Sequence, residues 1–262
     1  MPSNPLAIRV LGSGTSSGVP TVGCECAVCR SADPRDSRLR PSILIQWGVY
    51  NILVDTTPDF RQQALREHIE HIDAVLYTHA HADHILGLDD LRPFNYRQNA
   101  AIPVYGSDDT LSNIQRVFRY VFENRSPNAA VPKVDLHVLN GGAVDLFGLR
   151  FEPIPLRHGT GTSHGYRFGS VAYLTDHSEI PDESMERLHG LDVLFLDALR
   201  HRPHPTHSTV AQSLATVERL KPKRAFFTHI SHDLPHAETE AGLPANVRMS
   251  YDGLRIEVAD PE

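Results

Sequence analysis

Residues 74–84 run Ala74-Val-Leu-Tyr-Thr-His79-Ala-His81-Ala-Asp83-His84 and place four potential metal ligands within six positions. The apolar run at the start is typical of a buried strand. Spacing of two residues on extended backbone turns the imidazoles of His79 and His81 to the same side. Asp83 stands where a helix is expected to begin, with His84 just inside it. Imidazole and carboxylate groups at such a junction suit two adjacent metal ions, whereas a solvated histidine-rich loop is the alternative interpretation.

Short β-branched and aromatic runs bounded by Gly, Pro or Asp predict the strands of the chain. They cover residues 6–11, 42–47, 50–55, 74–78, 103–105, 149–154, 166–175, 193–197, 225–228 and 254–258. Helices are predicted at residues 58–67, 84–90, 107–122 and 208–220, the last with Ser208 as its N-cap. Strands joined by hairpins and by helical crossovers imply an α/β protein with mixed sheets covered by helices. With no linker-like change of composition, one domain spanning residues 1–262 is expected.

Composition and charge exclude several classes of protein. The 262 residues are 40% hydrophobic and 22% charged, as in ordinary globular proteins. A formal net charge of -7 argues against a nucleic-acid partner, because the surface would repel a polyanion. No apolar run approaches the roughly 18 residues that span a bilayer, and residues 1–5 do not resemble a signal peptide. We therefore expect a cytoplasmic protein that does not contact a membrane.

The three cysteines of the chain, Cys24, Cys26 and Cys29, all lie within six positions. An odd number of clustered thiols makes a poor disulfide framework and favours a metal site. A closed tetrahedral zinc site needs four ligands, so the fourth would be a histidine or a carboxylate. The spacing does not choose between His232 and His236. A group of reduced, partly buried thiols is the alternative.

The motif H-x-H-x-D-H that starts at His79 resembles the signature of the metallo-β-lactamase fold superfamily. This resemblance implies an αββα sandwich, in which two mixed β-sheets are flanked by helices. It also implies three further ligands, each at the end of a strand: His158, Asp176 and His229. By analogy, two divalent ions, Zn or Mn, are held by His79, His81 and His158 on one side and by Asp83, His84 and His229 on the other, with Asp176 bridging. Asp55 matches a family position that supports the ligands from behind, and a turn or cap aspartate is the alternative.

The glycine-rich and cysteine-rich segment from Leu11 to Cys29 resembles the PhnP branch of that superfamily. The branch is named for the cyclic-phosphate phosphodiesterase of bacterial phosphonate breakdown. The resemblance implies one structural zinc ion, held by the three cysteines and by the histidine three residues after the last catalytic one. In the run His229-Ile-Ser-His232, that histidine is His232.

Two metal ions about 3.5–4 Å apart can share a hydroxide, which here would attack phosphorus. Two aspartates among the seven ligands leave the pocket positive once two ions are bound, which favours a small anionic substrate. We expect a phosphodiesterase acting on a small cyclic phosphate or a nucleotide-like diester, and the resemblance points to 5-phosphoribosyl 1,2-cyclic phosphate. Related phosphodiesterases use a histidine in the loop that holds His207 as general acid, so His207 is expected to be catalytic together with Asp83. The alternative interpretation of His207 is a surface histidine that flanks a helix and takes no part in catalysis.

The same loop contains three further groups that could bind phosphate oxygens, or form an unpaired surface cluster: His201, Arg202 and His204. A tRNA 3′-processing nuclease shares the catalytic ligands but needs a basic arm that is not evident here. A thioester hydrolase such as glyoxalase II shares the seven ligands without the cysteines. A non-catalytic cofactor-biosynthesis protein would keep the cysteines and lose catalytic histidines. Residues 92–127 are a hypothetical homodimer contact.

Overall fold

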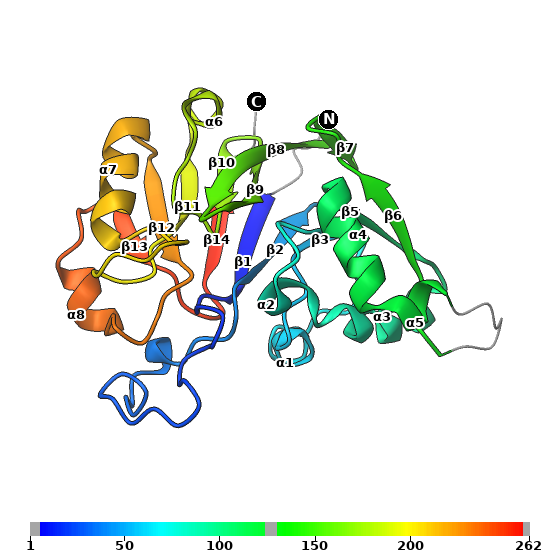
Figure 1. Ribbon diagram of the computed structural model, residues 1–262, viewed down its shortest axis with the longest axis horizontal. Coiled ribbons are helices and arrows are strands. Elements are labelled where there is room, and N and C mark those ends of the chain that lie inside the picture. Colours follow the sequence, from blue (N-terminus) through cyan, green and yellow to red (C-terminus); the bar gives the residue numbers. More distant parts are fainter. Residues whose placement is uncertain (1–5, 124–129, 259–262) are drawn as a thin grey trace.

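Two seven-stranded β-sheets pack face to face in the computed structural model, which describes residues 6–123 and 130–258, and helices cover both outer faces (Figure 1). The first sheet has the strand order β14-β1-β2-β3-β4-β5-β6, and the second has the order β13-β12-β11-β10-β9-β8-β7. Parallel and antiparallel pairs occur in both sheets. The α/β class and the sandwich of two mixed sheets between helices are confirmed.

The strands are β1 (Leu6–Gly12), β2 (Ser42–Trp47), β3 (Tyr50–Val54), β4 (Ala74–Leu76), β5 (Ile102–Gly106), β6 (Val134–Val138), β7 (Val144–Leu146), β8 (Leu149–His158), β9 (Gly161–Phe168), β10 (Val171–Leu174), β11 (Val193–Asp197), β12 (Arg224–Thr228), β13 (Val247–Met249) and β14 (Arg255–Val258). The helices are α1 (Phe60–Arg66), α2 (Ala82–Ile85), α3 (Arg92–Gln98), α4 (Asp108–Val117), α5 (Arg119–Phe122), α6 (Asp182–Glu186), α7 (Val210–Leu220) and α8 (His236–Ala241). Two 3-10 turns, η1 (Pro34–Asp36) and η2 (Leu88–Leu91), complete the set. None of these helices is both long and apolar enough to cross a membrane.

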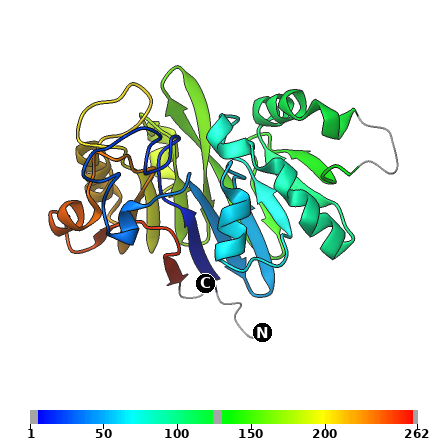
Figure 2. The same cartoon turned by 90° about the horizontal axis from the view of Figure 1, so that it is seen from below.

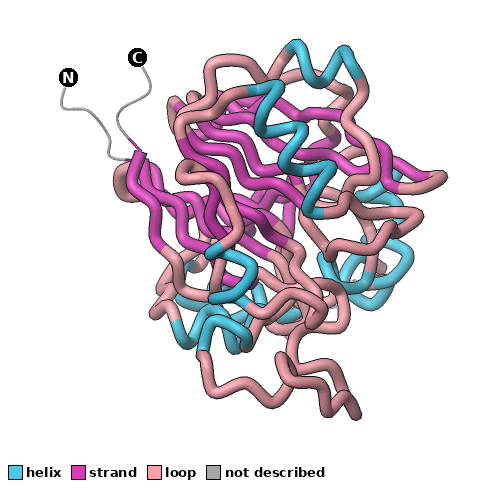
Figure 3. The backbone as a smooth tube through the Cα atoms, turned by 90° about the vertical axis from the view of Figure 1, so that its left-hand side faces the viewer, coloured by secondary structure: helices cyan, strands magenta, loops and turns pink. Residues whose placement is uncertain are grey.

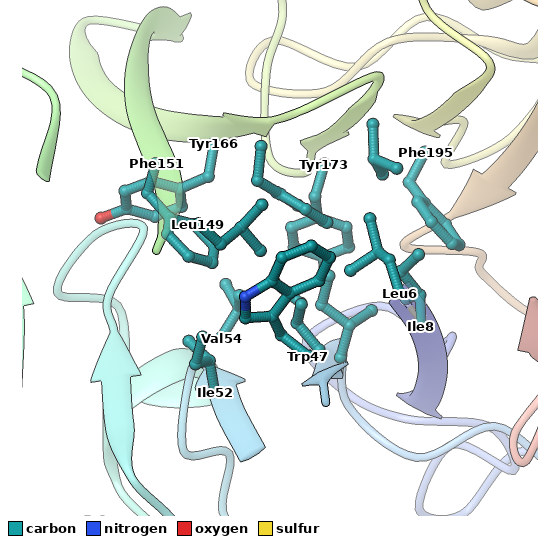
Figure 4. Packing of buried hydrophobic residues seen from close by; sticks show 14 of the residues in the cluster. Leu6, Ile8, Trp47, Ile52, Val54, Leu149, Phe151, Tyr166, Tyr173 and Phe195 are labelled. Atoms are coloured by element: carbon teal, nitrogen blue, oxygen red, sulfur yellow. The ribbon is translucent and has the colours of Figure 1, made fainter. Parts of the chain in front are cut away.

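The layer between the sheets is apolar and closely filled. Side chains of the first sheet, such as Ile52, Val54 and Trp47, face Phe151 and Tyr173 of the second (Figure 4). Because successive residues of a strand point to opposite faces, the residue between two inward ones meets the helices instead. A strand buried on both faces is therefore a continuous apolar run, which explains why these strands were predictable from the sequence.

Each outer face has its own apolar cluster. Helices α1, α3 and α4 pack on the first sheet, and α6 and α7 pack on the second. Figures 2 and 3 show the two sheets as adjacent layers between these groups of helices. The four layers leave the ends of the strands, rather than their faces, as the place where polar side chains can gather.

Two predicted elements are divided in the structure. The strand predicted at residues 166–175 is a hairpin of β9 and β10 that turns at Gly169, whose φ is 56°. The helix predicted at residues 107–122 breaks at Phe118, with φ -100° and ψ 39°, into α4 and α5. Both corrections arise because one residue leaves the regular conformation while the hydrophobic pattern continues across it.

Two helix boundaries also differ from prediction. The helix predicted at residues 84–90 is replaced by α2 and η2. The helix predicted at residues 208–220 begins at Val210 because Thr209, rather than Ser208, is its N-cap. Thr209 accepts from the N–H of Gln212 at 3.2 Å, and Gln212 accepts from the N–H of Thr209 at 2.8 Å, which is a capping box. The elements that the sequence did not predict are short: β6, β7, β13, α3, α6 and α8.

Five strands of the two sheets end at the same edge of the sandwich, and a polar residue lies at or just beyond each of these ends. Asp55 follows β3, and His79 lies three residues after β4. His158 is the last residue of β8, Asp176 follows β10, and His229 follows β12. The sandwich thus brings together side chains that are distant in the sequence.

Candidate metal centre

Two groups of potential ligands meet at this edge of the sandwich. In each group, ligand atoms of all members lie within 4.8 Å of one another. The first group consists of His79, His81 and His158, and the second of Asp83, His84, Asp176 and His229. All seven residues that were predicted from the sequence as ligands of a two-ion centre therefore lie close together.

Asp176, a member of the second group, also faces the first group. Its Oδ2 is 3.2 Å from Nε2 of His229, and 3.9 Å from Nε2 of both His79 and His158. Its Oδ1 is 3.3 Å from Nε2 of His84. One carboxylate thus faces imidazoles of both groups, which is the placement that a bridging ligand requires.

Side chains and carbonyls behind the groups fix the orientation of the rings. Nδ1 of His84 lies 2.7 Å from Oδ2 of Asp55, and a carboxylate only accepts, so His84 donates from Nδ1 and turns Nε2 toward the centre. Nδ1 of His158 donates in the same way to the carbonyl of Thr206 at 2.8 Å. Thr78 donates to Asp55 through both its N–H and its hydroxyl, each at 2.8 Å. Asp55 therefore contacts a predicted ligand directly, which agrees with the supporting position that the family resemblance implied.

Four buried ring nitrogens in the two groups make no well-aligned hydrogen bond to a described residue: Nε2 of His79, Nε2 of His84, and both Nδ1 and Nε2 of His229. Nε2 of His84 and of His229 face Asp176 at 3.3 and 3.2 Å, whereas Nε2 of His79 is 3.9 Å from it. An unpaired nitrogen in the interior costs free energy, and a bound cation is a partner that removes this cost. Imidazole and carboxylate form a donor set that Zn²⁺ and Mn²⁺ both accept. The residues present therefore fit a pair of divalent ions.

The carboxylates of the second group act on the imidazoles beside them. Burial by itself would lower the pKa of His229, but the neighbouring Asp176 and Asp83 raise it to about 10. In the first group burial dominates and holds the pKa of His79 well below its usual value. The second group thus carries an excess of negative charge that either a proton or a metal ion can neutralise.

The backbone is strained at three residues of the centre. Asp55, Asp176 and His229 have φ values of 65°, 53° and 58°, in the left-handed region that residues with a Cβ seldom adopt. This conformation costs about 1–2 kcal/mol for each such residue. Each of the three lies one or two residues after a strand, so the strain turns a side chain inward near the point where the strand ends.

His207 lies against the centre and is held there by Asp197. Its ring stacks on that of His229 with centroids 4.3 Å apart, and its Nδ1 is 2.8 Å from Oδ2 of Asp197. The same oxygen accepts the backbone N–H of His177 at 3.1 Å. The sequence analysis did not select Asp197, although it ends a buried apolar strand in the same manner as Asp55 and Asp176. That shared position was the signal that could have found it.

The other polar residues of this loop are spread out. His204 is near His207, with ring centroids 5.1 Å apart, and its Nδ1 lies 3.1 Å from the hydroxyl of Thr206. Arg202 is exposed and pairs with Asp233 at 3.0 Å. His201 is also exposed. Of the three predicted phosphate contacts, the structure brings only His204 to the side of His207.

The cysteines form a separate group with His232. Nδ1 of His232 lies 3.2, 3.6 and 3.4 Å from the sulfurs of Cys24, Cys26 and Cys29. Bonds of about 2.3 Å to sulfur and about 2.0 Å to nitrogen place tetrahedral zinc ligands about 3.5 Å apart, so the group fits one zinc ion. The N–H of Cys29 lowers the pKa of the Cys26 thiol to about 7, which favours the thiolate that zinc binds. His236, the other histidine that the spacing allowed, is not part of the group.

Comparison with known proteins shows the superfamily of the chain. Residues 50–230 match the beta-lactamase superfamily domain. A crystal structure of a new diphosphatase from the PhnP family superposes with a TM-score of 0.92, at 54% identity over 97% of each chain. Zn²⁺-bound PqqB from Methylobacterium extorquens superposes with a TM-score of 0.78, at 21% identity over 96% of this chain and 100% of that one, which shows a shared fold alone.

One curated relative is longer than this chain. An octanoyltransferase of Porphyromonas gingivalis is 41% identical over 249 residues, which are 94% of this chain and 50% of that protein. The chain therefore spans half the length of this relative.

Proposed function

The chain belongs to the β-lactamase superfamily of hydrolases and, within it, to the PhnP family, and on this basis we propose that it is a metal-dependent phosphodiesterase. The proposed substrate is a small cyclic phosphate or a nucleotide-like diester, with 5-phosphoribosyl 1,2-cyclic phosphate as the first compound to test. The high identity to a PhnP-family protein over nearly the whole of both chains supports a phosphoryl substrate.

In this proposal the first group of residues would hold one divalent ion, Zn or Mn, and the second group would hold another, with Asp176 available to both. Two such ions supply a nucleophile from water at neutral pH and offset the negative charge of phosphoryl oxygens. Asp55 and the carbonyl of Thr206 keep the imidazoles of His84 and His158 turned toward the ions. Asp83, a catalytic residue in the prediction, would act as a ligand of the second group. The cysteine group would hold one structural zinc ion.

The position of His207 is the observation that carries the choice of a phosphodiester. Because Asp197 binds its Nδ1, the nitrogen that can deliver a proton to the leaving oxygen is Nε2. An alkoxide leaves poorly without a proton, whereas a thiolate, with a thiol pKa of about 8.5, leaves readily without one. A buried histidine held in place beside the ligands therefore favours an oxygen leaving group over the thioester alternative. It also opposes a non-catalytic role, for which such a group has no use.

Two further substrate classes have support from single comparisons. A diphosphate diester is favoured by the similarity to a diphosphatase, and it would use the same ligands and the same proton donor. An acyl thioester is favoured by the similarity to an octanoyltransferase, although this chain corresponds to only half of that protein. The tRNA nuclease alternative has weaker support. A ribonuclease Z of Bradyrhizobium diazoefficiens is 28% identical over 143 residues, which are 53% of this chain and 47% of that protein. The likeness to human tRNase Z, at 17% identity and a TM-score of 0.68, shows the fold alone.

The remaining expectations stay predictions. They are a single hydrolase domain over residues 1–262, a cytoplasmic location, a small anionic substrate as the partner, and a homodimer through residues 92–127. Residues 1–5, 124–129 and 259–262 lie outside the described part of the chain. The segment compared with a signal peptide and residues 124–127 of the proposed dimer contact are therefore outside it too. Phosphate contacts by His201, Arg202 and His204 also stay a proposal.

Metal content and a side-by-side substrate panel test the proposed function. The purified chain would be analysed for Zn, Mn and Fe, then assayed with 5-phosphoribosyl 1,2-cyclic phosphate, bis(p-nitrophenyl) phosphate, a nucleoside diphosphate sugar, precursor tRNA and octanoyl and glutathione thioesters. We expect three ions per chain and the largest kcat/KM on one of the small phosphodiesters or on the diphosphate. The largest kcat/KM on precursor tRNA, turnover of thioesters alone, or a chain without transition metal would contradict the proposal.

A further inference from the structure

Arg38 is a buried cation whose guanidinium binds backbone carbonyls of a distant segment. Its side chain is 0% exposed. Nη1 donates to the carbonyl of Ser231 at 2.8 Å, and Nη2 donates to the carbonyl of Leu234 at 2.7 Å. Nη2 also donates to Oδ1 of Asp36 at 2.9 Å, which supplies the opposite charge. Because a buried charge is tolerated only when it is paired and hydrogen-bonded, these contacts define where the segment must lie.

The two carbonyls stand on either side of His232 in the sequence. His232 carries the nitrogen that faces the three cysteine sulfurs at 3.2 to 3.6 Å. One planar guanidinium that reaches both flanking carbonyls therefore fixes the backbone from which this ring projects. Lysine, with a single nitrogen at the end of a flexible chain, cannot present the same fork.

The segment held by Arg38 also contains His229 of the two-ion centre. His229 is in the strained left-handed conformation, and the residues that follow it are bound on several sides. The N–H of Ile230 donates to the carbonyl of Ser13 at 2.9 Å, and the N–H of Ser231 donates to the carbonyl of Leu199 at 3.0 Å. Arg38 completes this set by binding the carbonyl of Ser231. Strained backbone persists only when its surroundings hold it, so Arg38 helps to keep His229 in place.

The backbone of Arg38 is joined to the loop that carries the cysteines. Its N–H donates to the carbonyl of Val19 at 2.7 Å, and the N–H of Val19 donates back at 2.8 Å. Earlier in the same loop, a Cβ on Gly14 would lie 2.8 Å from the carbonyl oxygen of Arg38, so only glycine allows this close approach. Through its backbone, Arg38 therefore contacts the loop that carries the cysteines. Through its side chain, it contacts the segment that carries His229 and His232.

We infer that Arg38 is a positioning residue that couples the cysteine–histidine group to His229 of the two-ion centre. It touches neither substrate nor reacting atoms and acts through the backbone at residues 229–234. The inference rests on the proposed function in one respect, namely that both groups bind metal ions. Loss of the guanidinium should loosen both sites together, although it removes no ligand from either.

The test compares R38Q and R38K with R35Q as the matched control. Arg35 lies three residues earlier, its side chain is 40% exposed, and it pairs with Asp33. Folding of each variant would be verified by near-UV circular dichroism and cooperative unfolding. Three readouts follow: amide hydrogen exchange of residues 229–236 in the metal-depleted chain, the rate of zinc transfer from the cysteine group to a chelator, and kcat and KM on bis(p-nitrophenyl) phosphate.

For R38Q we expect exchange and zinc transfer at least 10-fold faster than in the wild type, and kcat at least 10-fold lower with KM within 2-fold. Amide hydrogen exchange in β4 should be the same in R38Q as in the wild type. For R38K, the exchange rate, the zinc-transfer rate and kcat should fall between those of R38Q and the wild type. For R35Q, all three should match the wild type. A folded R38Q or R38K with wild-type exchange and zinc transfer would overturn the inference. Failure of both Arg38 variants to fold would overturn it too, because the residue would then stabilise the whole chain.

These readouts separate the inference from the proposed function. A wild-type chain that hydrolyses no phosphodiester contradicts the proposed function, while hydrogen exchange in the metal-depleted chain still decides the role of Arg38. A wild type that is active, together with an R38Q variant that is indistinguishable from it, contradicts only the inference.

Discussion

Oδ2 of Asp55 lies 2.7 Å from Nδ1 of His84, and neither side chain is exposed to solvent. The same carboxylate accepts the N–H and the hydroxyl of Thr78. These contacts leave Asp55 no freedom to rotate, so the orientation of the His84 ring is set before any ligand arrives. Preorganisation of this kind is what gives residues behind a metal ligand their effect on affinity.

Replacing Asp55 by asparagine should weaken metal binding at the two-ion centre by about 10- to 100-fold, because an amide does not fix the Nδ1–H tautomer of His84. Competition titration with a chromophoric chelator measures this affinity. Asp33→Asn is the control, since Asp33 pairs with Arg35 on the surface and should leave the affinity unchanged. Equal affinity of Asp55→Asn and the wild type would show that this contact does not tune the centre.

Replacing His207 by alanine should lower kcat on an alkyl phosphodiester by about 10²–10⁴-fold, because the leaving alkoxide loses its proton donor. The loss should be much smaller on bis(p-nitrophenyl) phosphate, whose phenolate leaves without protonation. Asp197→Asn should show the same dependence on the leaving group in weaker form, since Asp197 orients the ring. Metal content should be unchanged in both. His189→Ala, whose side chain is 56% exposed and lies in neither group of ligands, serves as the control, and equal losses on the two substrates would remove His207 from proton transfer.

Cys24→Ser and His232→Gln should each release one zinc ion per chain while the two-ion centre keeps its metal. Because a structural zinc ion stabilises the folded state, the melting temperature should fall by about 2–4 °C for each kcal/mol lost in a chain of this size. His236→Gln is the comparison that discriminates, since His236 lies outside the cysteine group and should retain the zinc. Retention of full metal content by Cys24→Ser would mean that the thiols do not bind zinc.

Replacing Phe195 by alanine should destabilise the chain by about 3–5 kcal/mol, because it opens a cavity between the two sheets. The Phe195 ring is fully buried and lies 5.9 Å from that of Tyr173 and 5.5 Å from that of Phe226. Val49→Ala, where the side chain is 78% exposed, should change stability by less than about 0.5 kcal/mol. Equilibrium unfolding in urea measures both variants, and equal midpoints would place Phe195 outside the core.

The sequence predicts the long apolar strands because burial on both faces leaves a continuous hydrophobic run, whereas the sandwich of two sheets was implied by the family resemblance. It predicts helices less well where one residue changes the outcome, as with the break at Phe118 and the capping box at Thr209. The strands at the sheet edges, β6 and β7, are short and largely exposed, so they add little to the apolar pattern of the chain. In β6 the alternation of Val134, Leu136 and Val138 with polar residues was the signal that could have found the strand.

For the site, the seven ligands were found because a local motif and a family resemblance together fix residue type and order. His232 was chosen over His236 only through the resemblance, and the distances agree with it. Asp197 and Arg38 were not found, for different reasons. Asp197 stands at a strand end that could have been noticed, whereas the contacts of Arg38 span more than 190 positions and depend on the folded chain.

The left-handed conformations of Asp55, Asp176 and His229 have a consequence for how the chain responds to its surroundings. Because the backbone of the unloaded centre is strained at these residues, ions bound there would stabilise the folded state and scarcely the unfolded one. Above the dissociation constant, each tenfold rise in free metal should add about 1.4 kcal/mol per ion to the free energy of unfolding. Heat resistance of this chain is then set by trace-metal supply as much as by its hydrophobic layers.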